Sequence, residues 1–111
     1  ASVTPADASE HCKKVYIQVT NNTGAPIKMV DLDYRDYGSR KWRSEPTPNE
    51  VIPNGGTWQE TRRLEKVNAE LTKLRIQFKR EKRSGKWHKR ENAYSGKATC
   101  TRGKIFKVTL R

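Results

Sequence analysis

The sequence has few of the residues that build a hydrophobic core. Only 19 of its 111 residues are Val, Ile, Leu or Phe, and its formal net charge is +12. A chain with less than roughly 20% of these residues and a high net charge often stays disordered. Two features oppose that outcome, because the apolar residues are patterned and the three Trp and four Tyr can each bury a large area. We therefore expect a folded chain whose thin core needs a crosslink.

Long apolar runs are also missing. None approaches the ~20 residues that a membrane-spanning helix needs, so the sequence predicts no transmembrane segment. The length suits one domain. Residues 1–11 are polar and lack periodicity, which predicts a flexible N-terminal leader before a single domain over 12–111. No basic and apolar signal segment precedes Ala1, so we expect any signal peptide to have been removed already.

Cysteine occurs only at positions 12 and 100. The chain has no CxxC pair, and His11 and His88 complete no obvious tetrahedral zinc set. We interpret Cys12 and Cys100 as a disulfide, which would stabilise the fold by roughly 4 to 5 kcal/mol in the chain-entropy model. Such a bond indicates an oxidising compartment, namely periplasm, secreted fluid or a lumen. The alternative is two free thiols in the cytosol.

Alternating apolar residues predict short β-strands. In residues 14–20, Val15, Ile17 and Val19 share one strand face. In residues 26–36 the apolar phase changes near Met29, which predicts a β-bulge there. We expect further strands around Trp42, from Trp58 to about Leu64, from Leu71 to Lys82, around Trp87, over 97–101 and over 104–110.

Turn signals separate these segments, and no long helix is convincing. Asn54-Gly55-Gly56 is a strong turn signal because Asn-Gly accepts positive φ at low cost. We expect an irregular stretch around Val51 and Ile52, a loop or short helical turn over 64–70, and a loop over 92–96. About eight short strands with such turns predict an all-β fold, an antiparallel β-sandwich or barrel-like sheet pair with one disulfide.

Acidic residues are nearly absent from the last forty positions. Residues 1–71 carry ten basic and ten acidic side chains, whereas residues 72–111 carry fourteen basic ones and only Glu81 and Glu91. Two basic runs, 79–83 and 86–90, flank one predicted hairpin turn and would project cations into one region. Such a concentration attracts an acidic partner. The alternative is a solvated basic surface that keeps the protein soluble.

Two similar segments each place a Trp among cations after a glycine turn, 40–43 and 86–89. One interpretation is that Trp42 and Trp87 face the core while the cations face water. The other is an aromatic and cationic recognition surface, since Trp and Arg dominate binding hot spots. The candidate partner-binding residues are Arg40, Lys41, Trp42, Arg43, Arg80, Lys82, Arg83, Lys86, Trp87, His88, Lys89 and Arg90.

Motifs of catalysis are missing. The chain has no GxSxG, HExxH, phosphate loop or Cys/His nucleophile arrangement, so we expect neither an enzyme nor a cofactor. Asp31, Asp33 and Asp36 lie in the second predicted strand. They could form a paired-carboxylate or cation site, but salt bridges to cross-strand Lys and Arg are the favoured interpretation.

The stretch Val15-Tyr16-Ile17-Gln18-Val19-Thr20-Asn21-Asn22-Thr23-Gly24, in a small basic chain with two cysteines, resembles bacterial periplasmic immunity proteins. It is most similar to those that protect cells against type VI secretion effectors, in particular against a muramidase domain carried on a secretion-spike protein. The resemblance implies a β-sandwich, a periplasmic location, no catalysis, frequent homodimers and inhibition by occluding the active cleft of a peptidoglycan hydrolase.

A second function class uses the same cations. A secreted module could bind a polyanion such as nucleic acid, a sulfated glycan or anionic lipid through the basic C-terminal hairpin, with Trp42 and Trp87 as stacking platforms. It predicts a steep salt dependence of binding. A third, membrane-active function is disfavoured because no amphipathic insertion helix is obvious.

Overall fold

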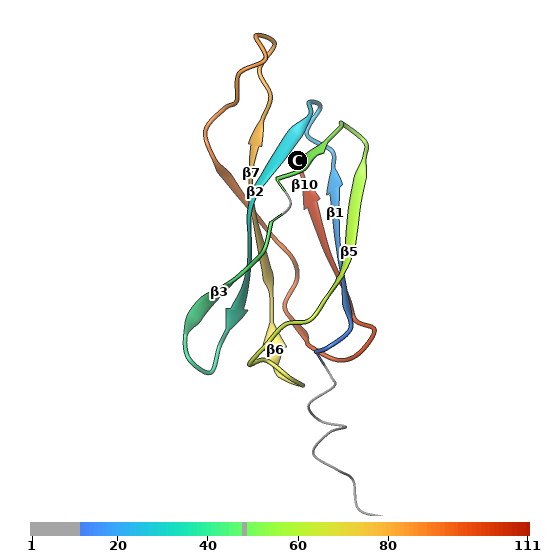
Figure 1. The fold of residues 1–111 in the computed structure, drawn as a ribbon, viewed down its shortest axis with the longest axis vertical. Coiled ribbons are helices and arrows are strands. Elements are labelled where there is room, and N and C mark those ends of the chain that lie inside the picture. The colour runs from blue at the N-terminus through green and yellow to red at the C-terminus, as the bar shows by residue number, and fades with distance from the viewer. Residues whose placement is uncertain (1–11, 48) are drawn as a thin grey trace, which may run out of the picture.

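The computed structural model describes residues 12–47 and 49–111, whose regular elements are all β-strands (Figure 1). The predicted leader, 1–11, lies outside the described residues. No helix that could cross a membrane occurs among the residues described. The strands are β1 (Val15–Asn21), β2 (Ile27–Asp36), β3 (Lys41–Glu45), β4 (Val51–Ile52), β5 (Thr57–Arg62), β6 (Leu71–Thr72), β7 (Leu74–Arg80), β8 (Glu91–Tyr94), β9 (Ala98–Thr99) and β10 (Ile105–Leu110).

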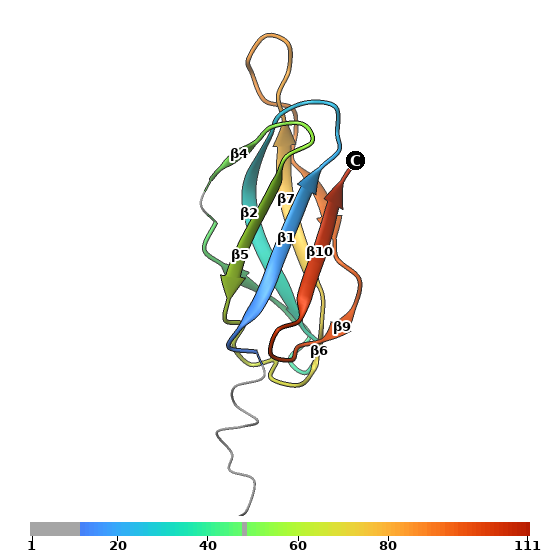
Figure 2. The same ribbon diagram turned by 90° about the vertical axis from the view of Figure 1, so that its right-hand side faces the viewer.

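Two sheets pack face to face and confirm the predicted β-sandwich. Sheet A has the order β10-β1-β5, and sheet B has the order β3-β2-β7-β8 with β4 beside β2 (Figure 2). Strands β6 and β9 form a small third sheet. Strand β1 pairs with β10 in parallel, whereas the other strand pairs are antiparallel.

The core lies between the two sheets, and alternation builds it. Val15, Ile17 and Val19 of β1 are buried, as predicted, and Phe106 and Val108 of β10 join them. Sheet B contributes every second residue of β7 (Leu74, Ile76 and Phe78) and four residues of β2 (Ile27, Met29, Leu32 and Tyr34) to the same cluster. Because a strand turns successive side chains to opposite faces, the residues between these positions form the outer face of each sheet.

Two local predictions are confirmed. The register between β2 and β7 shifts between Met29 and Asp31, which is the β-bulge expected there. The bulge lets both Met29 and Leu32 reach the core. In the predicted Asn-Gly turn, Gly55 has a φ of 83°, a value that a residue without a Cβ adopts at low cost.

Four strand predictions were wrong in detail. The expected strand 71–82 is broken at Lys73, since Leu71 and Thr72 pair with β9 instead. Trp87 makes one isolated bridge to Glu81. Val51 and Ile52 form β4, and 91–94 form β8 where a loop was expected. Both are short edge strands that contain at most one buried residue, so the apolar signal in their sequences is weak.

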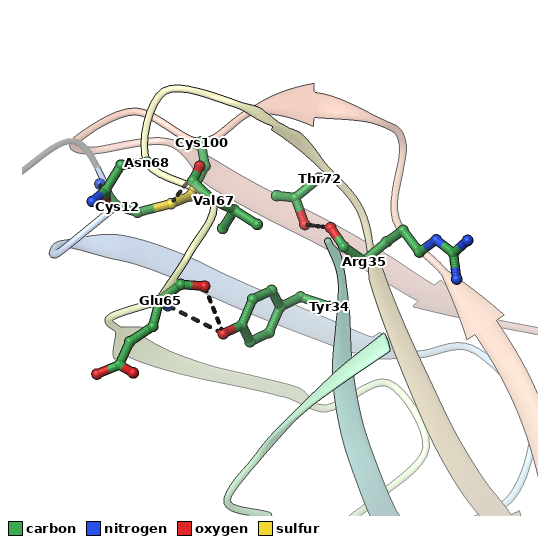
Figure 3. The surroundings of a disulfide bond; sticks show 8 residues. All are labelled: Cys12, Tyr34, Arg35, Glu65, Val67, Asn68, Thr72 and Cys100. Atoms are coloured by element: carbon green, nitrogen blue, oxygen red, sulfur yellow. Dashed lines mark hydrogen bonds between the residues drawn. A yellow bond between two sulfur atoms is a disulfide. The ribbon is translucent and has the colours of Figure 1, made fainter. Parts of the chain in front are cut away.

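The disulfide Cys12–Cys100 is present, with a Cα–Cα distance of 5.3 Å. Both cysteines are buried, and Cys100 directly follows β9, whereas the sequence placed it inside the expected strand over 97–101. The bond joins the start of the described chain to its last quarter. Figure 3 shows the loop of residues 64–70 lying against it, with the Sγ atom of Cys12 at 3.6 Å from the carbonyl oxygen of Val67.

Backbone hydrogen bonds fasten this loop to both cysteines. The amide of Leu64 donates to the carbonyl of Cys12 (3.0 Å), and the amide of Ala69 donates to the carbonyl of Cys100 (2.9 Å). The hydroxyl of Tyr34 donates to the carbonyl of Glu65 at 2.9 Å (Figure 3). The disulfide and this loop therefore lie together at one end of the sandwich. Strand β7 ends at Arg80 at the opposite end.

Candidate functional site

A basic hairpin projects beyond the sandwich between β7 and β8. We define it as residues 81–90, the narrow loop at the top of Figure 1. The amide of Lys82 donates to the carbonyl of Lys86 (2.7 Å), and the amide of Gly85 donates back to the carbonyl of Lys82 (2.9 Å). Gly85 has a φ of 82°, which closes the tight turn. The two legs are thus hydrogen-bonded to each other and hold a defined shape.

The hairpin concentrates positive charge, as the sequence predicted. Its five Lys and Arg side chains are exposed, and Glu81 is its one carboxylate. None of these five cations forms a salt bridge within the part of the chain that the structure describes. They are Lys82, Arg83, Lys86, Lys89 and Arg90. A partner carboxylate could therefore pair with them without first displacing an internal one.

Arg80 was predicted to contact a partner, but the structure places it at the base of the hairpin with its guanidinium engaged. It makes two hydrogen bonds to the carboxylate of Glu91, at 2.7 and 3.1 Å. It also donates to the carbonyl oxygens of Thr23 and Arg111. Bidentate Arg–carboxylate pairs are geometrically specific. Arg80 therefore fixes the direction in which the hairpin leaves the sandwich.

Backbone hydrogen bonds tie both legs of the hairpin to the sandwich as well. The amide of Glu81 donates to the carbonyl of Pro26 at 2.9 Å, and the amide of His88 donates to the carbonyl of Arg80 at 2.8 Å. A shallow open groove at the base is lined by Arg80, Lys82, His88, Lys89 and Glu91. The exposed surface of the groove is mostly apolar, although three of its five lining residues are Lys or Arg, so an acidic side chain or chain terminus could pair with the charges at its edge.

The structure separates the two Trp-containing segments. Ile27 of β2 pairs with Arg80 beside the basic hairpin, whereas Asp36 at the other end of β2 pairs with Lys41. Ten strand residues span roughly 30 Å. Figure 1 shows the turn between β2 and β3 at the opposite end of the molecule from the basic hairpin. Residues 40–43 and 86–89 therefore form two surfaces.

The interpretation that Trp42 and Trp87 face the core is wrong. Both are half-buried, and neither belongs to the core cluster, in which Trp58 is the buried Trp. Trp87 lies on a leg of the basic hairpin. Trp42 pairs with Arg35 on the outer face of sheet B, and the guanidinium of Arg75 lies 4.3 Å from its ring centroid.

Sequence reasoning missed several residues around Trp42. Arg35, Lys73, Arg75 and Tyr94 come from β2, the β6–β7 junction, β7 and β8. No local pattern joins them, because only the strand register brings them to one face. The available signal was the alternation in β7, which assigns Arg75 to the face opposite Leu74 and Ile76.

Asp33 and Asp36 of β2 form salt bridges, as the favoured interpretation held, whereas Asp31 forms none among the described residues and accepts a hydrogen bond from the amide of Leu32. Asp33 accepts two hydrogen bonds from Arg75, at 2.9 and 3.2 Å, and Asp36 accepts one from Arg43 at 2.8 Å. Arg43 is thus engaged, whereas Arg40 and Lys41 are exposed. Within the described residues, no group of three or more His, Cys, Asp or Glu side chains could hold a metal ion.

The hydrogen bond from Arg43 holds the pKa of Asp36 at about 2, below its ordinary value of 3.8. The amide of Ser39 also donates to this carboxylate (3.2 Å). A carboxyl whose pKa is lower in the folded state stabilises the fold above its unfolded pKa. The contribution should therefore be present above about pH 4 and be lost as the pH falls toward 2.

Asp36→Asn tests this dependence. We expect the variant to unfold more easily than the parent protein in urea at about pH 6, and the gap in the free energy of unfolding to shrink as the pH falls through about 2, the folded pKa of Asp36, below which both side chains are neutral. A gap that stays constant over this range would show that the carboxylate charge of Asp36 contributes nothing.

Comparison with known proteins finds no match for this chain among family models, curated proteins or solved structures. The fold and the two surfaces therefore carry the functional argument.

Proposed function

We propose that this chain is a non-catalytic immunity protein that binds a cell-wall-degrading, muramidase-type effector and occludes its active-site cleft with the basic hairpin. The proposal places the chain in the periplasm and includes assembly as a homodimer. The observation that carries it is the shape and charge of the basic hairpin, which combines five exposed cations with a hydrogen-bonded turn outside the sandwich.

The chemistry of the target supports the proposal. Glycoside hydrolases commonly place two carboxylates on either side of the scissile bond, so their clefts carry acidic groups that a cationic loop could pair with. Lys86 and Lys89 on the exposed leg are suited to pair with such carboxylates. Complementary charge speeds the encounter, which matters for a protein that must capture a toxin before it cuts. Trp87, half-buried on the same leg, supplies an anchor of the residue type enriched in hot spots.

The disulfide supports an exported protein. Disulfides persist in oxidising compartments and are rare in the cytosol. The muramidase substrate, peptidoglycan, also lies outside the inner membrane, so inhibitor and target would share one compartment.

The test is inhibition of a purified muramidase domain encoded beside the gene for this chain. Clearing of a peptidoglycan suspension is followed as the chain is added in increasing ratio. We expect activity to fall linearly and to end at a fixed ratio of the two proteins, as for a tight stoichiometric complex. Undiminished clearing at excess inhibitor, or clearing by this chain alone, would refute the proposal.

A second candidate is polyanion binding by the basic hairpin. It is favoured by the same exposed cations, which form no salt bridge within the described residues and could contact phosphates or sulfates instead of carboxylates. The two functions differ in salt dependence and selectivity. A polyanion binder should retain many unrelated polyanions and lose them steeply between 50 and 200 mM salt, whereas an inhibitor should select one acidic protein.

A further inference from the structure

The outer face of sheet B alternates cations with aromatic rings. We define this aromatic–cation face as seven residues that lie far from the basic hairpin along β2: Arg35, Tyr37, Trp42, Lys73, Arg75, Tyr94 and Lys97. They come from β2, the β2–β3 turn, β3, β7 and its preceding residue, β8 and the β8–β9 loop. The face therefore crosses the whole width of the sheet.

Contacts at the centre of the face involve Trp42. The guanidinium of Arg75 lies 4.3 Å from its ring centroid, and that of Arg35 lies 5.6 Å away. The ammonium of Lys73 lies between two rings, 5.8 Å from the centroid of Trp42 and 5.1 Å from that of Tyr94. Each distance is within the ~6 Å at which a ring attracts a cation.

The same alternation continues toward the turn. Arg35 lies between Trp42 and Tyr37, at 5.9 Å from the Tyr37 centroid, and the ammonium of Lys97 lies 4.8 Å from the same ring. Each of the four cations therefore lies within about 6 Å of at least one ring centroid. Rings restrict the cations but do not neutralise their charge, so each cation can still pair with an anion.

The face has a surplus of positive charge. Arg75 has a carboxylate partner, Asp33, which is itself nearly buried. Arg35, Lys73 and Lys97 form no salt bridge among the residues that the structure describes. Tyr94 at the sheet edge is 49% exposed as a residue and offers apolar surface beside these charges. The surface thus suits a ligand that is anionic, extended and partly apolar.

We infer that the aromatic–cation face binds a linear acidic polysaccharide, with its carboxylates or sulfates on Arg35, Lys73 and Lys97 and a pyranose ring against Tyr94. A glycan fits better than single-stranded nucleic acid, because the ring planes of Trp42 and Tyr94 are tilted by 44° and the rings carry cations, which leaves no parallel platform for successive bases. The buried disulfide also indicates a compartment where acidic glycans occur. This inference does not depend on the proposed inhibitor function, since the two surfaces are separate.

Two double charge-reversal variants with the same net charge test the inference. Arg35→Glu/Lys73→Glu alters the aromatic–cation face, and Lys86→Glu/Lys89→Glu alters the basic hairpin. The probes are a heparin-derived hexasaccharide, which carries sulfates, and a hexagalacturonate, which carries only carboxylates. We expect at least one probe to bind the parent protein at about 150 mM salt. Its affinity should fall at least tenfold in Arg35→Glu/Lys73→Glu and less than threefold in Lys86→Glu/Lys89→Glu. The probe that binds identifies the anionic group.

A substitution that keeps the net charge distinguishes the contribution of the aromatic rings to binding from the contribution of the total charge. Trp42→Leu leaves the net charge unchanged and removes the ring that three cations contact. We therefore expect the affinity for the bound probe to fall fivefold or more. Where this variant fails to form the disulfide, Tyr94→Leu at the exposed edge provides the same test. The inference is overturned if neither probe binds, if the two charge reversals weaken binding equally, or if an octamer of thymidylate binds more tightly than both probes through the same residues.

Discussion

Replacing Cys12 and Cys100 together by serine should lower the free energy of unfolding by about 4 kcal/mol and the Tm by roughly 20 °C. The crosslink spans 88 positions, so its removal restores a large conformational entropy to the unfolded chain. The folded state should also loosen locally, because the amides of Leu64 and Ala69 bond to the backbones of the two cysteines. Thermal unfolding followed by near-UV circular dichroism measures both effects.

Burial of the disulfide should also protect it from reductants. Both cysteines are buried, so a reductant should leave the folded parent protein oxidised and lower its stability only after unfolding in denaturant. If the double serine variant keeps the Tm of the parent, the sandwich is stable without the crosslink, and the requirement for an oxidising compartment is lost.

Reversing the charge of Lys86 and Lys89 should slow association with the muramidase domain by ten- to a hundredfold at low salt. The side chains lie on one leg of the basic hairpin and supply two of its five exposed cations, which attract an acidic cleft before contact. The measurement is stopped-flow fluorescence at several salt concentrations. The difference between the variant and the parent protein should narrow as salt screens the field.

A matched control keeps the net charge equal. Lys104→Glu/Lys107→Glu also lowers the net charge by four units, but both positions belong to the β10 region of sheet A, and Lys107 lies on its outer face. We expect this control to associate within threefold of the parent rate. If both variants are slowed equally, the effect comes from total charge, and the basic hairpin has no special part in binding.

The sandwich could be predicted from sequence because its central strands are buried on one face. Val15, Ile17 and Val19 alternate with polar residues, and β10 does the same with Phe106 and Val108. β8 could not be predicted, since its inward residue is the small Ala93 and its apolar signal is correspondingly weak. The parallel pairing of β1 with β10 was equally out of reach, because strand direction in a sheet depends on contacts between distant segments.

The candidate surfaces were predictable in composition but not in placement. The basic runs around Gly85 correctly predicted a cationic hairpin. Sequence could not distinguish Arg80, which bonds to Glu91, from Lys82, which is exposed, because both lie in one run of cations. The alternation around Trp42 was clear, but the choice of face depended on the register of β3 against β2. That register also assembles the aromatic–cation face.

Hydrogen exchange of the complex tests the central claim most directly, namely that the basic hairpin enters the cleft of an acidic hydrolase. Amide exchange of this chain is measured alone and with a saturating amount of the muramidase domain. We expect protection to rise most at the exposed hairpin amides over 83–87, while the outer face of sheet A stays unchanged. Protection that is absent from the hairpin, or concentrated on another face of the bound chain, would contradict the account.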